Sequence, residues 1–231
     1  EMCIRDSNIE IYVGNFNDIE PSLDCDYDLV CLIGVFEYGN SYIHTKTPYE
    51  DFFQIMQKHK KSTGLLVIAI ENKFGLKYWA GCKEDHVGAY FSGLEGYPEG
   101  GSARTFTKRG LEKIFERCGE TNYHFYYPYP DYKFPTEIFT DESLYTNSYG
   151  RNYPVYTDKT ADLFSEHAGV KAFEKEKILS SFVNSFLVEA GRTERQEKEE
   201  ILYVKLNQER KEKFRLLTKI VRENGEVRAE K

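Results

Sequence analysis

The stretch YDLVCLIGVFEY, residues 27–38, decides the fold of this chain. Its apolar part, residues 29–33, is continuous rather than alternating, and β-branched side chains are frequent in it. Such a run is typical of a strand that is buried on both faces, as in a parallel sheet covered by helices. Gly34 ends the strand and allows the backbone to approach a ligand or a neighbour closely. Glu37 and Tyr38 then follow at the carboxyl end of the strand, which is the edge where ligands bind in open α/β sheets.

A second apolar run, residues 64–70, predicts a parallel neighbour of this strand. Between the two runs, Thr47, Pro48 and Glu50 indicate a helix start with a capping box and a proline at the first helical position. The helix then carries one apolar face, formed by Tyr49, Phe52, Phe53 and Met56 at helical spacing. Strand, helix and strand within about 45 residues predict a right-handed βαβ unit.

The remaining elements predict an α/β protein. We expect strands at 8–13, 123–127 and 185–190, a turn at 14–18, and helices at 107–118 and 170–181. Two prolines should turn residues 126–132 into a rigid aromatic loop that leaves its strand. After Gly191 the composition changes to a charged linker, followed by a two-stranded hairpin at 201–206 and 214–221. The domain division is therefore 8–191 and 192–231, the second part being an edge extension of the sheet or the start of a further module.

Residues 71–106 form a connection far longer than an α/β unit needs. The segment is rich in glycine, aromatic and charged residues, and it contains the only tryptophan, Trp79. Aromatic residues are sparse in disordered chains. We therefore expect an ordered lid.

Composition narrows the function classes. The chain has 231 residues and a formal charge of -7. Residues 192–231 hold 12 basic and 9 acidic residues, which gives +3 there and -10 in the remainder. An acidic main body argues against nucleic acid as a partner. No apolar run reaches the roughly 20 residues of a membrane span, and no signal peptide is visible. The five cysteines form no CxxC pair and no metal spacing, so we expect reduced thiols, a cytoplasmic location and no bound metal.

Residues 1–7 resemble the translation of a transposon-end adapter used in preparing sequencing libraries. On this interpretation they are an artefact, and the natural chain would be cut off upstream of Asn8. The alternative is an ordinary flexible terminus.

Three groups of residues carry a resemblance to a known family. They are residues 13–16 after the first expected strand, residues 27–38, and the lid segments 70–78, 84–88 and 95–98. Together with the order of elements up to Ala190, they resemble the second half of a class I S-adenosylmethionine-dependent methyltransferase. The lid segments are similar to bacterial methyltransferase domains that accompany glycosyltransferases of cell-surface polysaccharide synthesis. The resemblance covers about four-fifths of the chain.

The resemblance implies a partial Rossmann-like sheet whose N-terminal half is missing, with a lid insertion and a C-terminal β-hairpin. Such enzymes carry a glycine-rich turn after their first strand and an acid after their second, and neither motif is present in this sequence. Two βαβ units of that kind amount to roughly 60–100 residues. As written, the chain would supply half of a site, so the fragment itself is expected to be inactive.

The resemblance also implies roles for individual residues. Asn15 and Phe16 would bracket the adenine of S-adenosylmethionine, and Ile33, Gly34 and Val35 would line the floor beneath the methyl donor. Core packing is an equal alternative for Phe16 and Val35. Glu37 and Tyr38 would face the substrate.

Methyl transfer to a hydroxyl needs a group that positions the acceptor and removes its proton. His86, beside Asp85, is one candidate base, because an imidazole titrates near neutrality. Glu37 is the other. A structural hydrogen bond that anchors the lid is as good an interpretation of His86, and Asp85 is open to a substrate contact instead.

Sugar recognition could use the aromatic residues of the lid. Tyr78, Trp79 and Tyr97 could stack on a sugar ring or pack the lid down. Arg104, with Lys77 and Lys83, could bind a phosphate or an acidic sugar, although exposed surface charge is the commoner role.

Three functional hypotheses follow. The first is methyl transfer to a hydroxyl of a cell-surface glycan or its precursor. The second is a non-catalytic module that docks a polysaccharide glycosyltransferase. The third is a nucleotide-sugar Rossmann enzyme, which requires a Tyr-x-x-x-Lys pair on a helix; Tyr129 and Lys133 have that spacing but lie in a segment broken by proline.

Overall fold

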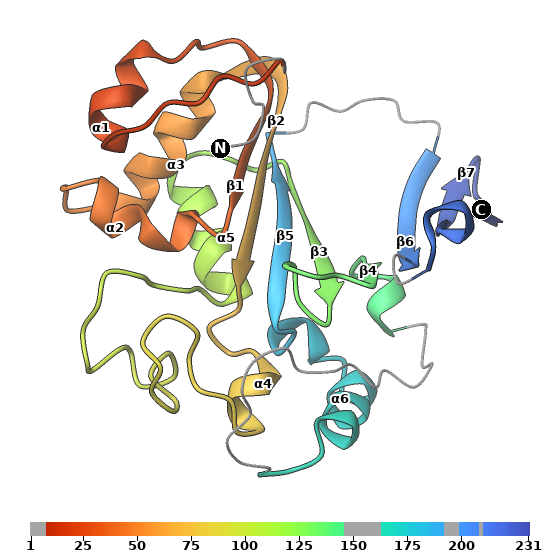
Figure 1. The fold of residues 1–231 in the computed structure, drawn as a ribbon. Coiled ribbons are helices and arrows are strands. Elements are labelled where there is room, and N and C mark those ends of the chain that lie inside the picture. Colours follow the sequence, from red (N-terminus) through yellow and green to blue (C-terminus); the bar gives the residue numbers. More distant parts are fainter. Residues whose placement is uncertain (1–7, 146–162, 192–198, 208–209) are drawn as a thin grey trace.

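The computed structural model describes residues 8–145, 163–191, 199–207 and 210–231 (Figure 1). In this part of the chain the strands are β1 Tyr27–Ile33, β2 Lys60–Glu71, β3 Tyr123–Tyr129, β4 Glu137–Phe139, β5 Ser185–Ala190, β6 Glu199–Asn207, β7 Leu216–Glu223 and β8 Glu226–Glu230. The helices are α1 Phe16–Ile19, α2 Gly39–Tyr42, α3 Pro48–His59, α4 Leu76–Trp79, α5 Lys108–Arg117 and α6 Glu166–Lys175. The strands form one open sheet in the order β1-β2-β5-β3-β4-β6-β7-β8.

The first unit of the sheet is β1-α3-β2. The two strands are parallel, with Leu29 opposite Leu65 and Ile33 opposite Ala69, which confirms the predicted βαβ unit. Strand β5 lies antiparallel between β2 and β3, so β1, β2 and β3 all run in the same direction. The α/β fold class with a large open, Rossmann-like sheet is therefore confirmed.

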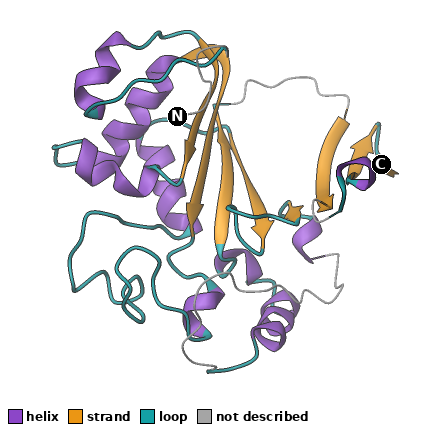
Figure 2. Ribbon diagram, viewed as in Figure 1, coloured by secondary structure: helices purple, strands orange, loops and turns teal. Residues whose placement is uncertain are grey.

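Helices α3 and α5 cover one face of this sheet (Figure 2). Their apolar faces meet in the core, where the rings of Phe53 and Phe115 lie 5.0 Å apart. Phe52, Phe53 and Met56 are buried, as their spacing predicts. At the start of α5 the Thr107 hydroxyl accepts a 3.0 Å hydrogen bond from the Gly110 N–H and caps the helix, which begins where the sequence predicts.

The prediction that β1 is buried on both faces is wrong. Of its side chains only Leu32 is buried, whereas Leu29 is 54% exposed and Ile33 50% exposed. The reason is position: β1 is the edge strand of the described sheet, so a neighbour covers it on the β2 side alone.

Two local predictions near the N-terminus are also wrong. Residues 8–13 form no strand, because no described strand pairs with them, and Val13 is 93% exposed. The capping box at Thr47 does not form either: its hydroxyl bonds to Asp51, while Glu50 pairs with Arg117. The predicted turn at 14–18 instead contains the short helix α1, capped by Asn15.

The proline-rich segment changes partners rather than leaving the sheet at once. Strand β3 pairs with β5 up to Tyr126, and Tyr127 to Tyr129 then pair with β4. Strand β4 in turn pairs with β6, which attaches the C-terminal hairpin to the sheet edge. The hairpin is confirmed and gains a third strand, β8. The helix expected at 170–181 begins earlier and ends at Lys175, followed by a 3₁₀ turn at 179–181.

Among the described residues, no helix combines the length and the apolar character needed to cross a bilayer.

Candidate functional site

The carboxyl ends of β1 and β2 carry the candidate site. Gly34, directly after β1, has φ of +64°, a conformation that favours glycine. A Cβ at Gly34 would lie 2.7 Å from the Tyr132 hydroxyl oxygen, so a side chain would collide there. The left-handed turn leads into the 3₁₀ turn Phe36–Tyr38, which buries the side chain of Glu37 at the tip of the strand.

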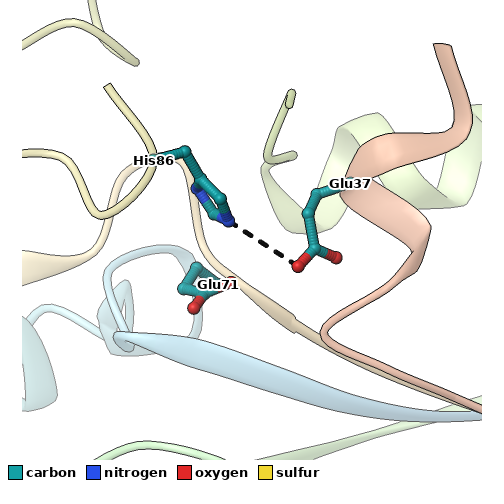
Figure 3. A group of neighbouring side chains, drawn as sticks. All are labelled: Glu37, Glu71 and His86. Atoms are coloured by element: carbon teal, nitrogen blue, oxygen red, sulfur yellow. Dashed lines mark ion pairs between the residues drawn. The ribbon is translucent and has the colours of Figure 1, made fainter. Parts of the chain in front are cut away.

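Three ionisable side chains from distant segments meet at this edge. Glu37 follows β1, Glu71 ends β2, and His86 comes from the lid (Figure 3). One potential ligand atom from each of the three residues lies within 4.8 Å of the other two. His86 Nε2 is 3.6 Å from Glu37 Oε1, and the Tyr38 ring packs edge-on against the imidazole.

A third carboxylate, that of Glu84, lies on the opposite side of the His86 ring from Glu37. Its Oε1 lies 3.1 Å from His86 Nδ1, and its Oε2 accepts hydrogen bonds from the backbone N–H groups of His86 and Val87. Burial of the imidazole opposes its charged form, but the interactions with Glu37 and Glu84 and the charge of Glu71 outweigh it and raise the pKa of His86 to about 10. At neutral pH this imidazole is therefore a cation between carboxylates.

Glu71 has its own charged and polar neighbours. Lys133 Nζ lies 2.6 Å from Glu71 Oε1, and the Tyr132 hydroxyl donates to the same oxygen at 3.3 Å. Burial, together with the charges of Glu71 and Glu37, raises the pKa of Tyr132 far above its usual range. The phenol is thus a neutral hydrogen-bond donor beside two carboxylates.

Asp85 points away from the imidazole of His86. It accepts a 2.5 Å hydrogen bond from the Tyr78 hydroxyl and an ion pair from Lys77 Nζ at 2.7 Å. Lys77 also lies 3.4 Å from Asp131. Burial works against the charge on Asp85, but the Lys77 ammonium and the hydrogen bonds from Lys77 and Tyr78 hold its pKa below its usual range.

The other sugar-recognition candidates lie in packing contacts of the lid. The Tyr97 hydroxyl shares a 2.6 Å hydrogen bond with Thr105, and Arg104 lies over the Tyr97 ring. The Arg104 guanidinium donates to three lid carbonyls, while its backbone N–H donates to the Glu37 carbonyl. Trp79 packs against Phe182. The lid is therefore ordered and is tied to the strand tips through Glu37.

The cofactor residues that the sequence predicts lie at the start of α1 and at the tip of β1. Phe16 is half-buried, and its ring packs edge-on against Phe52, which stacks in turn on Phe36, the residue before Glu37. Asn15 is exposed and caps α1 through its side-chain oxygen. Gly34 and Val35 are half-buried, and Ile33 leaves an exposed apolar surface at the tip of β1.

The sequence did not reveal Glu71, Glu84, Tyr132 or Lys133 as members of the site. Glu71 had a usable signal, because it ends an apolar strand at the same edge as Glu37. Lys133 reaches Glu71 from the loop after β3, and no local sequence pattern predicts that contact. Tyr129, its partner in the Tyr-x-x-x-Lys spacing, packs on Phe139 instead, so the two side chains serve different neighbours.

Comparisons with known proteins add one distant structural similarity. No protein-family model and no curated protein match the sequence. A solved structure of a SAM dependent methyltransferase from Archaeoglobus fulgidus is similar over 80% of this chain and 68% of its own, with 12% identity and a TM-score of 0.42. A similarity of that extent leaves the assignment to the geometry of the chain itself.

Proposed function

We propose that this chain forms the acceptor side of an S-adenosylmethionine-dependent methyltransferase that modifies a hydroxyl of a cell-surface glycan or its precursor. The observation that carries the proposal is Glu37. Its side chain is 2% exposed, and its Oε2 has no hydrogen-bond partner among the described residues. A buried carboxylate oxygen that has no hydrogen-bond partner, at the carboxyl end of a strand, is suited to accept a proton from a bound hydroxyl.

The residues near the tip of β1 fit a donor of this kind. Ile33 presents a half-exposed apolar surface next to the Gly34 turn, and Phe16 and Val35 are only half-buried. Asn15 and Phe16 would hold the adenine, while Ile33, Gly34 and Val35 would lie beneath the methionine portion. When bound, S-adenosylmethionine supplies a methyl group activated by its attachment to a sulfonium.

Glu37, rather than His86, takes the role of base. Both ring nitrogens of His86 face carboxylates, and its pKa of about 10 keeps it protonated at neutral pH. The acceptor oxygen would form its bond to the methyl carbon as the carbon–sulfur bond breaks, and its proton would pass to Glu37 Oε2. His86 would hold Glu37 in position through the opposite oxygen.

Two hydrogen-bond acceptors and an aromatic ring at the site support the acceptor class that we propose. Glu37 and Glu71 each leave one buried carboxylate oxygen without a partner among the described residues, and Tyr38 offers a ring beside them. Hydroxyl groups on a ring with apolar faces, as in a sugar, would use both features. We propose a glycosyltransferase of surface-polysaccharide synthesis as the partner, because the lid segments resemble methyltransferase domains that accompany such enzymes.

The proposal is tested on the full-length gene product. We expect calorimetry to give micromolar binding of S-adenosylmethionine. Glu37→Gln should lower methyl transfer to a glycan acceptor about 10²–10⁴-fold, the usual contribution of a positioned base, with donor affinity unchanged. Glu95→Gln, an exposed acid on the same lid, is the matched control. Absence of donor binding, or an unchanged rate in Glu37→Gln, would refute the proposal.

A further inference from the structure

Glu37, Glu71 and His86 form a compact set of potential metal ligands at the tips of β1 and β2. One ligand atom from each lies within 4.8 Å of the other two, and the three side chains lie together, with His86 facing Glu37 (Figure 3). Glu37 is 2% exposed, Glu71 is fully buried, and the His86 side chain is 11% exposed. Each residue comes from a different, well-anchored segment, so the set is held in place by the fold.

The carboxylates of this set have unmet bonding capacity. Oε2 of Glu37 and Oε2 of Glu71 are buried, and neither has a hydrogen-bond partner among the described residues. A buried charged oxygen that has no hydrogen-bond partner destabilises the folded state, and a bound cation would remove that penalty. Three carboxylates, those of Glu37, Glu71 and Glu84, gather around His86, and Lys133 pairs with Glu71, so the site has more carboxylate than lysine charge.

His86 has the surroundings of a metal-binding histidine. Its Nδ1 lies 3.1 Å from Glu84 Oε1, while its Nε2 lies 3.6 Å from Glu37 Oε1. Histidines that bind metals almost always donate their second ring N–H to a carboxylate or carbonyl, which fixes the ring and its tautomer. Glu84 is itself fixed by two backbone N–H groups, so it orients the imidazole rigidly.

We propose that Glu37, Glu71 and His86 bind a divalent first-row transition-metal ion, with the His86 imidazole releasing its Nε2 proton to solvent as the ion binds and Glu84 orienting the ring. One imidazole and two carboxylates suit Mn²⁺ or Zn²⁺ better than Mg²⁺, which prefers oxygen ligands and retains its waters. The inference rests on these side chains and does not depend on the methyl-transfer proposal. One oxygen of Glu37 would still remain to accept a proton.

Lys133 is the natural competitor of the metal. Its ammonium lies 2.6 Å from Glu71 Oε1, and its side chain is 46% exposed, so it can move to solvent when a bound ion replaces it as the counter-charge of Glu71. In the metal-bound state two positive charges would otherwise face the same carboxylate. Removing Lys133 should therefore tighten metal binding, whereas a purely structural ion pair predicts no such gain.

The test uses the 231-residue chain after treatment with a chelator, because all the named ligands lie within it. Calorimetry and electron paramagnetic resonance with Mn²⁺, and calorimetry with Zn²⁺, should show one ion bound per chain. Glu71→Gln and His86→Gln should each weaken binding by at least about 100-fold, and Glu84→Gln by about 10–100-fold. Asp28→Asn, a change to an exposed acid on β1, should leave the affinity unchanged.

Lys133→Met decides the case if the buried variants do not fold, since it alters a half-exposed side chain. We expect it to bind Mn²⁺ at least about tenfold more tightly, because a like charge next to the ion is removed. The proposal is overturned if neither ion binds at millimolar concentration. It is equally overturned if binding survives Glu71→Gln and His86→Gln, or if Lys133→Met leaves the affinity unchanged or weaker.

Discussion

Two ionic clusters lie near each other at the same end of the sheet and differ in how far their atoms are satisfied. In the first cluster Lys77 lies between Asp85 and Asp131, and the Tyr78 hydroxyl adds a bond to Asp85. In the second, Glu37, Glu71 and His86 converge, but two carboxylate oxygens have no partner among the described residues. We name them the anchoring cluster and the open cluster.

The difference separates structural charge from functional charge. A buried charge that is fully paired fixes local geometry. Removing one member of the pair is costly, because the other charge stays buried without a counter-charge. A buried charge that is incompletely paired lowers stability and persists where a ligand completes it. On this basis the anchoring cluster holds the lid to the loop after β3, and the open cluster is where we propose that the chemistry takes place.

The largest expected effect is the loss of Lys77 from the anchoring cluster. Lys77→Met should lower the free energy of unfolding by about 3–5 kcal/mol, because Asp85 and Asp131 would both lose their buried counter-charge. Chemical denaturation at neutral pH measures this directly. The control is Lys83→Met in the same lid, where the side chain is exposed and the change should stay within about 0.5 kcal/mol.

A loss below about 1 kcal/mol in Lys77→Met would show that the anchoring cluster carries little stability. The distinction between the two clusters would then fail on its structural side.

The sequence predicts the parallel unit β1-α3-β2 well. Continuous apolar runs and helical spacing locate β1, α3 and β2, and the carboxyl-end rule selects Glu37 as a site residue. Exposure of β1 is a different matter, because it depends on which strand lies next to it, and a run such as residues 29–33 looks the same at an edge and in the middle of a sheet.

The sequence also does not predict which charged side chains pair with one another. Asp85 is adjacent to His86, and proximity along the chain suggests a pair, but the backbone at 84–86 turns the two side chains toward different neighbours. Glu84 reaches His86 Nδ1, and Asp85 reaches Lys77. Lys133 and Asp131 arrive from a loop that is distant in sequence, so only the folded sheet brings them into contact with β2 and the lid.

An intermediate effect is expected at Tyr78. Tyr78→Phe removes one hydrogen bond to a buried carboxylate and should cost about 1.5–3 kcal/mol of unfolding free energy, since Asp85 would keep Lys77 but lose its second donor. Tyr97→Phe is the matched comparison, because both tyrosines are 5% exposed and lie in the lid, and the Tyr97 hydroxyl bonds to the neutral Thr105. That loss should be smaller, about 0.5–1.5 kcal/mol. Equal losses in the two variants would mean that the charge of Asp85 adds nothing.

The smallest expected effect on stability lies in the open cluster. Glu37→Gln keeps the shape of the side chain and removes a buried charge whose Oε2 has no partner among the described residues. In the presence of a chelator we expect the free energy of unfolding to rise, or to change by less than about 1 kcal/mol. Glu84→Gln is the sharper comparison, because both oxygens of Glu84 accept hydrogen bonds, two of them from backbone N–H groups. It should cost about 2 kcal/mol in the same assay. If Glu37→Gln instead proves as destabilising as Glu84→Gln, then Glu37 is a structural residue, and the open cluster loses its claim to be the reacting end of the molecule.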